Sequence, residues 1–208
     1  MKIADLPNNN LFCPLPWRGA HIMPNGTFSY CCVQNQFDED LKAAGDLRKQ
    51  TISQARNNAW SNELRKDLID GVQHKSCRNC WDLENQGIKS LRQHYHNQWF
   101  EDNGYAENFE FNSDGTLNDQ NIIYWDVRQT NLCNMNCVMC GPDYSSLWNR
   151  DILKSQNKPV PKGGVIDAVQ VSKDNILDII KKDIDKTYKF YFSGGEPLII
   201  PMDCAILE

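Results

Sequence analysis

The sequence predicts an α/β protein in which a small, cysteine-rich α+β unit precedes the first strands of a parallel sheet. Residues 122–127 and 188–192 are rich in β-branched and aromatic side chains, and residues 172–184 between them place apolar side chains on one helical face. Strand, helix, strand is the order of a βαβ unit. Five of the nine cysteines lie earlier, among turns and short amphipathic segments. We therefore expect units at 1–104 and 121–208, joined by a linker at 105–120.

In the first unit, the pair Asn25-Gly26 predicts a hairpin between strands at 20–23 and 27–30, because this dipeptide suits turns that need positive φ. A helical pattern follows over 51–71 and stops at Gly71. A second, polar helix is expected over 81–99. In the second unit, a further helix is expected over 144–156.

Composition excludes several classes of function. The 208 residues carry a formal charge of −5 and no long block of one sign, so they lack the basic footprint of a nucleic-acid-binding protein. No apolar stretch approaches the roughly 18 residues of a membrane helix. Residues 1–7 lack the apolar core of a signal peptide. We expect a cytoplasmic protein with no nucleic-acid or membrane partner.

That placement decides how the cysteines are interpreted. Thiols stay reduced in the cytoplasm, so grouped cysteines indicate metal binding or catalysis rather than disulfides. The odd number, nine, also argues against a fully paired disulfide framework. Seven of the nine sit within four positions of another cysteine along the chain. Metal binding is the simplest interpretation.

The densest group is the C-x3-C-x2-C run of Cys133, Cys137 and Cys140, just after the strand-like segment 122–127. Three thiolates can hold three irons of a four-iron cluster, whereas an electron-transfer [4Fe–4S] centre uses four cysteines. Three ligands leave one iron open, and an open metal position allows chemistry, as is best documented for zinc. The alternatives are a zinc knuckle or a chance group of free thiols.

A second motif, Gly194-Gly195-Glu196-Pro197, follows the strand-like segment 188–192. Parallel sheets bind ligands at this end of their strands. Glycines let the backbone approach a ligand closely, and Glu196 offers a carboxylate to a cationic group. Alone, the tetrapeptide also suits an ordinary strand-to-helix turn. Beside the cysteine run, it favours a ligand whose amino-acid end chelates iron while its ammonium meets the carboxylate.

The segment from Asp126 to Cys140, followed by Gly194–Pro197, resembles the start of the core of radical S-adenosylmethionine (SAM) enzymes, a partial (βα) barrel. The resemblance implies that Cys133, Cys137 and Cys140 bind a [4Fe–4S] cluster. It also implies that Gly194, Gly195, Glu196 and Pro197 bind SAM. A one-electron donor such as flavodoxin or ferredoxin is the implied partner. The reduced cluster would cleave SAM to a 5′-deoxyadenosyl radical, which takes hydrogen from a substrate. One departure is Met139, where the family often has an aromatic residue.

The N-terminal cysteines form a C-x12-G-x4-C arrangement, completed by a C-x2-C pair. This arrangement resembles the SPASM or shorter twitch auxiliary-cluster domain of radical SAM enzymes, although that domain usually follows the core. The resemblance implies a second [4Fe–4S] cluster, and by analogy a peptide or protein substrate. A zinc ribbon is the alternative. Cys32 can replace Cys31, but the glycine spacing favours Cys31. The implied ligands are Cys13, Cys31, Cys77 and Cys80.

The chain after Ile122 has room for only the first two strands of such a barrel. We therefore expect the N-terminal portion of a radical SAM enzyme, either a truncated chain or the product of a split gene that a second polypeptide would complete. The alternative is a non-catalytic iron–sulfur or zinc module, or a remnant, that acts with a partner chain. Arg128 and Asn131 are weaker candidates for cofactor contacts, and Cys204 is expected to be a small buried residue. The four histidines are weaker candidates for metal ligands: His21, His74, His94 and His96.

Overall fold

The computed structural model describes residues 11–34, 45–98, 110–118, 121–167 and 172–207. A single sheet organises these residues, with the strand order β2-β1-β3-β4. β1 and β2 are antiparallel, while β1–β3 and β3–β4 are parallel pairs. The predicted α/β class and the parallel sheet are therefore confirmed, whereas two core strands do not establish a barrel. The strands are β1 (Gly19–Ile22), β2 (Phe28–Ser29), β3 (Tyr124–Val127) and β4 (Lys189–Phe192).

The predicted hairpin joins β1 to β2. Gly26 adopts φ 84°, and the Asn25 side-chain oxygen accepts a hydrogen bond from the Thr27 N–H. The Met23 N–H also donates to the Thr27 carbonyl across the turn. These contacts explain why Asn-Gly at this position sets the register of the two strands.

The helix predicted over 51–71 forms as two helices, α3 (Ile52–Arg56) and α4 (Ala59–Ile69). Asn58 causes the break, because its backbone is extended and its side chain caps α4 by accepting from the Ser61 N–H. Gly71 has φ 73° just past α4, as the stop signal predicts.

The second predicted helix, 81–99, also divides. α5 (Arg78–Asn85) ends near Gly87, which has φ 73°, and α6 (Leu91–Asn97) restarts at a capping box between Ser90 and Gln93. A 3-10 turn, η3 (Lys75–Cys77), precedes α5. The N-terminal unit also contains α1 (Leu15–Arg18). The prediction missed both divisions because helical periodicity continues across them.

The C-terminal residues alternate helices with β3 and β4, as predicted. The crossover between these strands contains α7 (Ser146–Ser155), η5 (Lys162–Gly164), α8 (Ile176–Lys182) and η7 (Ile184–Lys186). After β4 come η8 (Pro197–Ile199) and α9 (Pro201–Leu207). No helix among the described residues is long and apolar enough to cross a bilayer.

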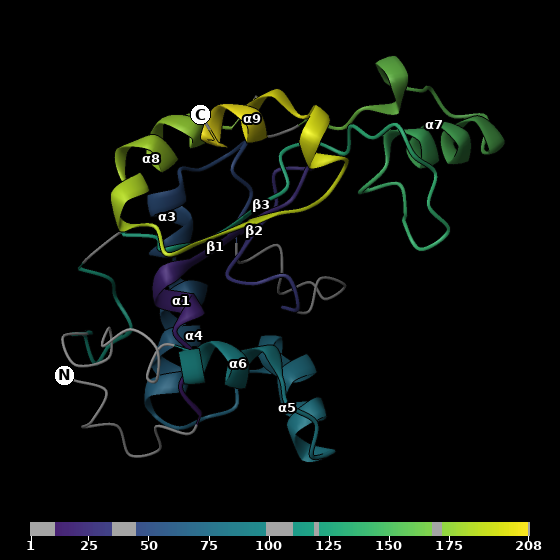
Figure 1. Ribbon diagram of the computed structural model, residues 1–208. Coiled ribbons are helices and arrows are strands. Elements are labelled where there is room, and N and C mark those ends of the chain that lie inside the picture. The colour runs from purple at the N-terminus through teal and green to yellow at the C-terminus, as the bar shows by residue number, and fades with distance from the viewer. Residues whose placement is uncertain (1–10, 35–44, 99–109, 119–120, 168–171, 208) are drawn as a thin grey trace.

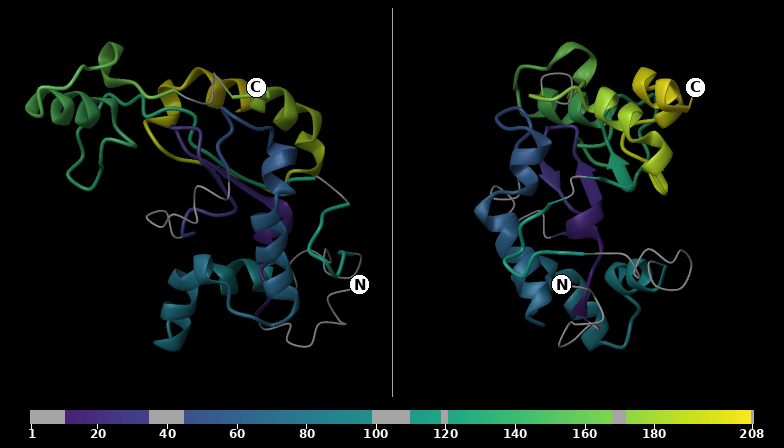
Figure 2. Two further views of the ribbon diagram at one scale, coloured as in Figure 1. Left: turned by 180° about the vertical axis from the view of Figure 1, so that it is seen from behind. Right: turned by 90° about the vertical axis from the view of Figure 1, so that its left-hand side faces the viewer.

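The helices form layers on both sides of the sheet. α8 and α9 cover one face, whereas α4, α5 and α6 lie on the opposite side, and α7 lies beyond the ends of the strands (Figure 1, Figure 2). One hydrophobic core runs through these layers and includes Trp17, Leu64, Trp125 and Ile180. The core therefore draws on residues from both predicted units.

The sheet also crosses the predicted unit boundary. β1 belongs to the first predicted unit, yet it pairs along its length with β3 of the second. The predicted linker at 105–120 lies partly outside the described residues. Within its described part, Phe111 is buried and its ring lies 6.0 Å from that of Trp17. The exact boundaries remain predictions, but the sheet and the core join the two units.

Candidate metal centres

Four cysteines that are far apart in the sequence line one cavity in the N-terminal unit. Cys13 lies just before α1, Cys31 just after β2, Cys77 at the end of η3, and Cys80 in the first turn of α5. α5 brings the last two thiols to the same place, and the β1–β2 hairpin brings Cys31 to them. These are the four residues that the resemblance to an auxiliary-cluster domain implies as ligands of the second cluster.

Burial raises the pKa values of these thiols. Desolvation is the largest cause at each, and it raises the pKa of Cys13 to about 12. The neighbouring thiols add to the effect, since thiolates at Cys77 and Cys13 would repel one at Cys31. Simultaneous deprotonation of the four thiols is therefore unfavourable unless a cation lies among them. A metal centre supplies that cation. The chemistry of the donor set thus fits a metal or a cluster.

A hydrogen-bonded layer supports this cavity. Burial raises the pKa of the Cys80 thiol, and the nearby backbone N–H of Arg92 opposes this effect. The Arg92 guanidinium donates to both Glu84 carboxylate oxygens, at 2.9 and 2.6 Å, and lies 4.9 Å from the Trp81 ring. It also donates to the Phe12 carbonyl, next to Cys13. Such partners hold metal ligands in place and tune the metal.

The second candidate centre is the loop that follows β3. Cys133 is buried, whereas Cys137 and Cys140 are exposed. The loop folds against the start of α7, because the Cys133 N–H donates to the Ser146 hydroxyl and the Trp148 indole donates to the Cys137 carbonyl. Burial is the largest cause that raises the pKa of Cys140, and the other two thiols add to it. The three thiols therefore interact at the carboxyl end of the sheet.

The Gly194–Pro197 segment packs directly on this loop. The Gly195 N–H donates to the Tyr144 carbonyl at 2.9 Å, and the Glu196 N–H donates to the Leu132 carbonyl at 2.8 Å. Both glycines have positive φ, 78° at Gly194 and 63° at Gly195. A Cβ on Gly195 would meet the Leu132 carbonyl oxygen, so the close approach requires glycine. The two motifs, about sixty residues apart in the sequence, therefore pack together as one structural unit.

Neither group of cysteines forms a site for a single ion. Among the described residues, no three His, Cys, Asp or Glu side chains lie where they could hold one metal ion. A tetrahedral zinc site would require four sulfurs at about 2.3 Å from one point. A four-iron cluster makes a different demand, because each cysteine binds its own iron. The four N-terminal thiols line one cavity and suit the second arrangement.

Cys32 and the histidines lie outside both groups. Cys32 lines a neighbouring cavity with Asp126 instead of the four-cysteine cavity. His21 is fully buried, with its Nδ1 2.7 Å from the Ser29 hydroxyl, and burial lowers its pKa to about 3. His74 caps η3 by accepting from the Ser76 N–H. His94 and His96 lie on α6, where His96 contacts the Phe12 carbonyl.

One further sequence prediction is wrong, and the two weaker candidates for cofactor contacts have structural partners near the cysteine loop. Cys204 is exposed, so the prediction of a buried residue is wrong. It lies on α9, whose inward-facing position is taken by Asp203 instead. Asn131 supports the cysteine loop: its amide donates to the Pro142 and Gly164 carbonyls, and its oxygen accepts from the Ile166 N–H. Arg128 pairs with Asp126 and lies under Gly194.

Sequence reasoning missed the residues that anchor the two centres. Ser146 and Tyr144 fix the cysteine loop, yet both belong to a stretch expected only to be helical. Arg92 belongs to the stretch 81–92, which the resemblance to an auxiliary-cluster domain includes, but its burial at 4% exposed was not predicted from a polar helix. A charged residue at a core-facing helical position beside a cysteine pair could have indicated its role.

Comparison with known families supports the first centre. Residues 13–81 match the SPASM iron–sulfur cluster-binding domain, so the match spans all four cysteines of the N-terminal cavity. The chain therefore contains an iron–sulfur cluster-binding domain of the kind found with radical SAM enzymes. No radical SAM core family matches the C-terminal residues. No curated protein and no solved structure matches the chain.

Proposed function

We propose that this chain belongs to a radical SAM enzyme and binds SAM at an open [4Fe–4S] cluster. The observation that carries the proposal is the contact between the two C-terminal motifs. The Gly194–Pro197 segment hydrogen-bonds to the loop of Cys133, Cys137 and Cys140, at the carboxyl ends of the adjacent parallel strands β3 and β4. That is where an α/β sheet presents ligands.

Each part of this arrangement has a role toward the cofactor. Cys133, Cys137 and Cys140 would hold three irons and leave the fourth open to the amino and carboxylate groups of SAM. The backbone at Gly194 and Gly195 would form the wall of the cofactor site, since no side chain intervenes. Glu196 would meet the cofactor's ammonium group. One Glu196 carboxylate oxygen caps η8 by accepting from the Leu198 N–H, which holds the side chain at this edge.

The bound cluster and SAM supply one-electron cleavage of a carbon–sulfur bond, and the protein supplies position and shielding. Asn131 and Ser146 hold the cysteine loop against α7. Arg128, paired with Asp126, fills the space under Gly194. These contacts keep the cluster loop and the SAM-binding segment at a fixed separation, which a reaction through a short-lived radical requires.

The SPASM domain would hold a second, closed cluster through Cys13, Cys31, Cys77 and Cys80. Four thiolates complete such a centre, so it suits electron relay or structure rather than SAM cleavage. The family match and the arrangement of the thiols around one cavity support iron–sulfur over zinc. By analogy with proteins that carry this domain, we propose a peptide or protein substrate and a flavodoxin or ferredoxin as the electron donor.

Iron counting tests this assignment. Anaerobic reconstitution with iron and sulfide is expected to give about eight irons for each chain, in two clusters of four. Replacing Cys133, Cys137 and Cys140 with alanine should leave about four, and so should replacing the four N-terminal cysteines. Exposed Cys204 provides the matched control, because Cys204→Ala should leave about eight. Tightly bound zinc without iron uptake would refute the assignment and favour a non-catalytic zinc module.

A further inference from the structure

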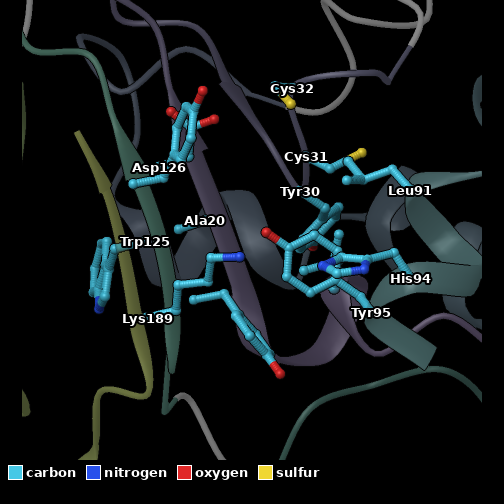
Figure 3. Close-up of a pocket in the computed structure, with 13 residues that line it drawn as sticks. Ala20, Tyr30, Cys31, Cys32, Leu91, His94, Tyr95, Trp125, Asp126 and Lys189 are labelled. Atoms are coloured by element: carbon cyan, nitrogen blue, oxygen red, sulfur yellow. The ribbon is translucent and has the colours of Figure 1, made fainter. Parts of the chain in front are cut away.

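A second cavity, of about 230 Å3, lies between the sheet and α6 (Figure 3). Tyr124, Asp126 and Lys189 line it from β3 and β4, and His94 and Tyr95 line it from α6. Its volume lies below the roughly 300–1,000 Å3 of sites for drug-sized ligands. It therefore suits one side chain or a small organic molecule. No role proposed above uses this cavity.

The cavity adjoins the four-cysteine site. Leu15, Tyr30, Cys31 and Leu91 line both cavities. A molecule bound here would therefore lie beside the auxiliary centre and against the strands that lead to the cysteine loop and to Gly194. Lys189 lies away from Cys31 and Cys32 within the cavity (Figure 3). A ligand can thus be recognised by Lys189 without displacing a cysteine.

The charges in the cavity are unequally balanced. Asp126 accepts two hydrogen bonds from the Arg128 guanidinium, at 3.0 and 3.1 Å, so its charge is compensated. The Lys189 ammonium lies 5.1 Å from the centre of the Tyr95 ring. Within the described ranges, no carboxylate lies within ion-pairing distance of Lys189. The cavity therefore presents one half-buried positive charge, at Lys189, with no counter-ion among the residues that the structure describes.

The walls around this charge are aromatic. Tyr95 packs edge-on against Tyr124 at 5.0 Å, and Tyr191 completes the lining on the side of the sheet. Burial, the largest cause, raises the pKa of Tyr95 to about 12, so this phenol remains neutral and does not balance Lys189. Aromatic rings favour an apolar or planar group beside the charged one.

We propose that this cavity binds a carboxylate attached to an apolar or aromatic group, with the Lys189 ammonium as its counter-ion and Tyr95 as its wall. The group can come from a free aromatic acid or from the C-terminal residue of a peptide. The proposed site is separate from the SAM-binding site and would hold a carboxylate ligand beside the auxiliary centre.

Titration of ligands into the iron-reconstituted full chain, monitored by saturation-transfer NMR, tests the proposal. The probes are 3-phenylpropionate and the peptide Gly-Gly-Phe with a free C-terminus, each paired with its neutral amide. At least one acid is expected to bind, and neither amide. Binding of the small acid alone identifies a free acid as the ligand, and binding of the peptide alone identifies a C-terminal carboxylate.

Substitutions then test the role of Lys189. Lys189→Met should weaken acid binding about tenfold, since a charge-assisted contact in a partly buried site is lost. Lys189→Arg should retain most of the binding. Lys181→Met on α8, on the opposite side of the sheet, is the matched control and should change nothing. Absence of acid binding, equal binding of acids and amides, or unchanged binding in Lys189→Met would overturn the proposal. Iron counts test the two clusters separately.

Discussion

Gly195 is the point where the predicted SAM-binding segment touches the cysteine loop, so Gly195→Ala perturbs the contact that carries the functional proposal. Its φ is 63°, a value that costs an L-residue roughly 1–2 kcal/mol. The new Cβ would also meet the Leu132 carbonyl oxygen and lie 3.0 Å from the Thr130 carbonyl oxygen. Backbone atoms cannot move aside as a flexible side chain can.

A matched control separates these two costs. Gly87 has φ 73°, close to that of Gly195, but a Cβ there would meet nothing within 4 Å. Gly87→Ala should therefore carry only the backbone cost, about 1 kcal/mol. Gly195→Ala should carry that cost and a steric cost of about 1–3 kcal/mol. We expect Gly195→Ala to lower the free energy of unfolding by about 3 kcal/mol.

Urea unfolding of the two variants and the parent chain measures these differences. SAM binding, measured by equilibrium dialysis with the reconstituted protein, should weaken in Gly195→Ala and remain unchanged in Gly87→Ala. Equal destabilisation by the two substitutions would refute the claim that the segment packs closely on Leu132. Unchanged SAM binding in Gly195→Ala would refute the assigned role of this contact.

Three further predictions concern the N-terminal cluster, the cysteine loop and a buried carboxyl group on α9. Arg92→Gln removes the positive charge opposite Glu84, so it should lower the reduction potential of the N-terminal cluster by tens of millivolts in a redox titration. Arg92→Lys keeps the charge and should leave the potential close to that of the parent chain. Asn131→Ala removes three hydrogen bonds from the cysteine loop and should halve the iron count by preferential loss of the C-terminal cluster. Burial raises the pKa of Asp203 to about 6, so its stabilising neutral form is present below about pH 4 and is lost as pH rises through 6. Asp203→Asn should therefore gain about 1–2 kcal/mol relative to the parent between pH 4 and 7 in urea unfolding, and a difference that does not vary with pH would contradict this.

Much of the fold could be predicted because its signals are local. The Asn25-Gly26 turn, the β-rich run before Cys133 and the helical stop at Gly71 each depend on residues close together in the sequence. The division of the two long helices was missed because the capping side chains at Asn58 and Ser90 interrupt a pattern that otherwise continues. Capping residues inside a periodic segment are therefore worth treating as breaks.

The joining of the two units could not be predicted, because it depends on long-range strand pairing. Nothing in the sequence of β1 shows that it pairs with β3 rather than only with β2. That pairing places the N-terminal cysteines on the side of the sheet that carries Lys189, and it forms the second cavity. Motif spacing indicates which residues bind a cofactor, but the neighbours of the site depend on sheet topology.

The central claim is that Cys133, Cys137 and Cys140 hold an open cluster that binds SAM. Electron paramagnetic resonance of the reduced Cys77→Ala/Cys80→Ala variant tests it most directly, because only the C-terminal cluster should contribute. We expect a [4Fe–4S] signal that changes when SAM is added and does not change when adenosine is added instead. A signal that SAM leaves unchanged, or the absence of any cluster in this variant, would contradict it.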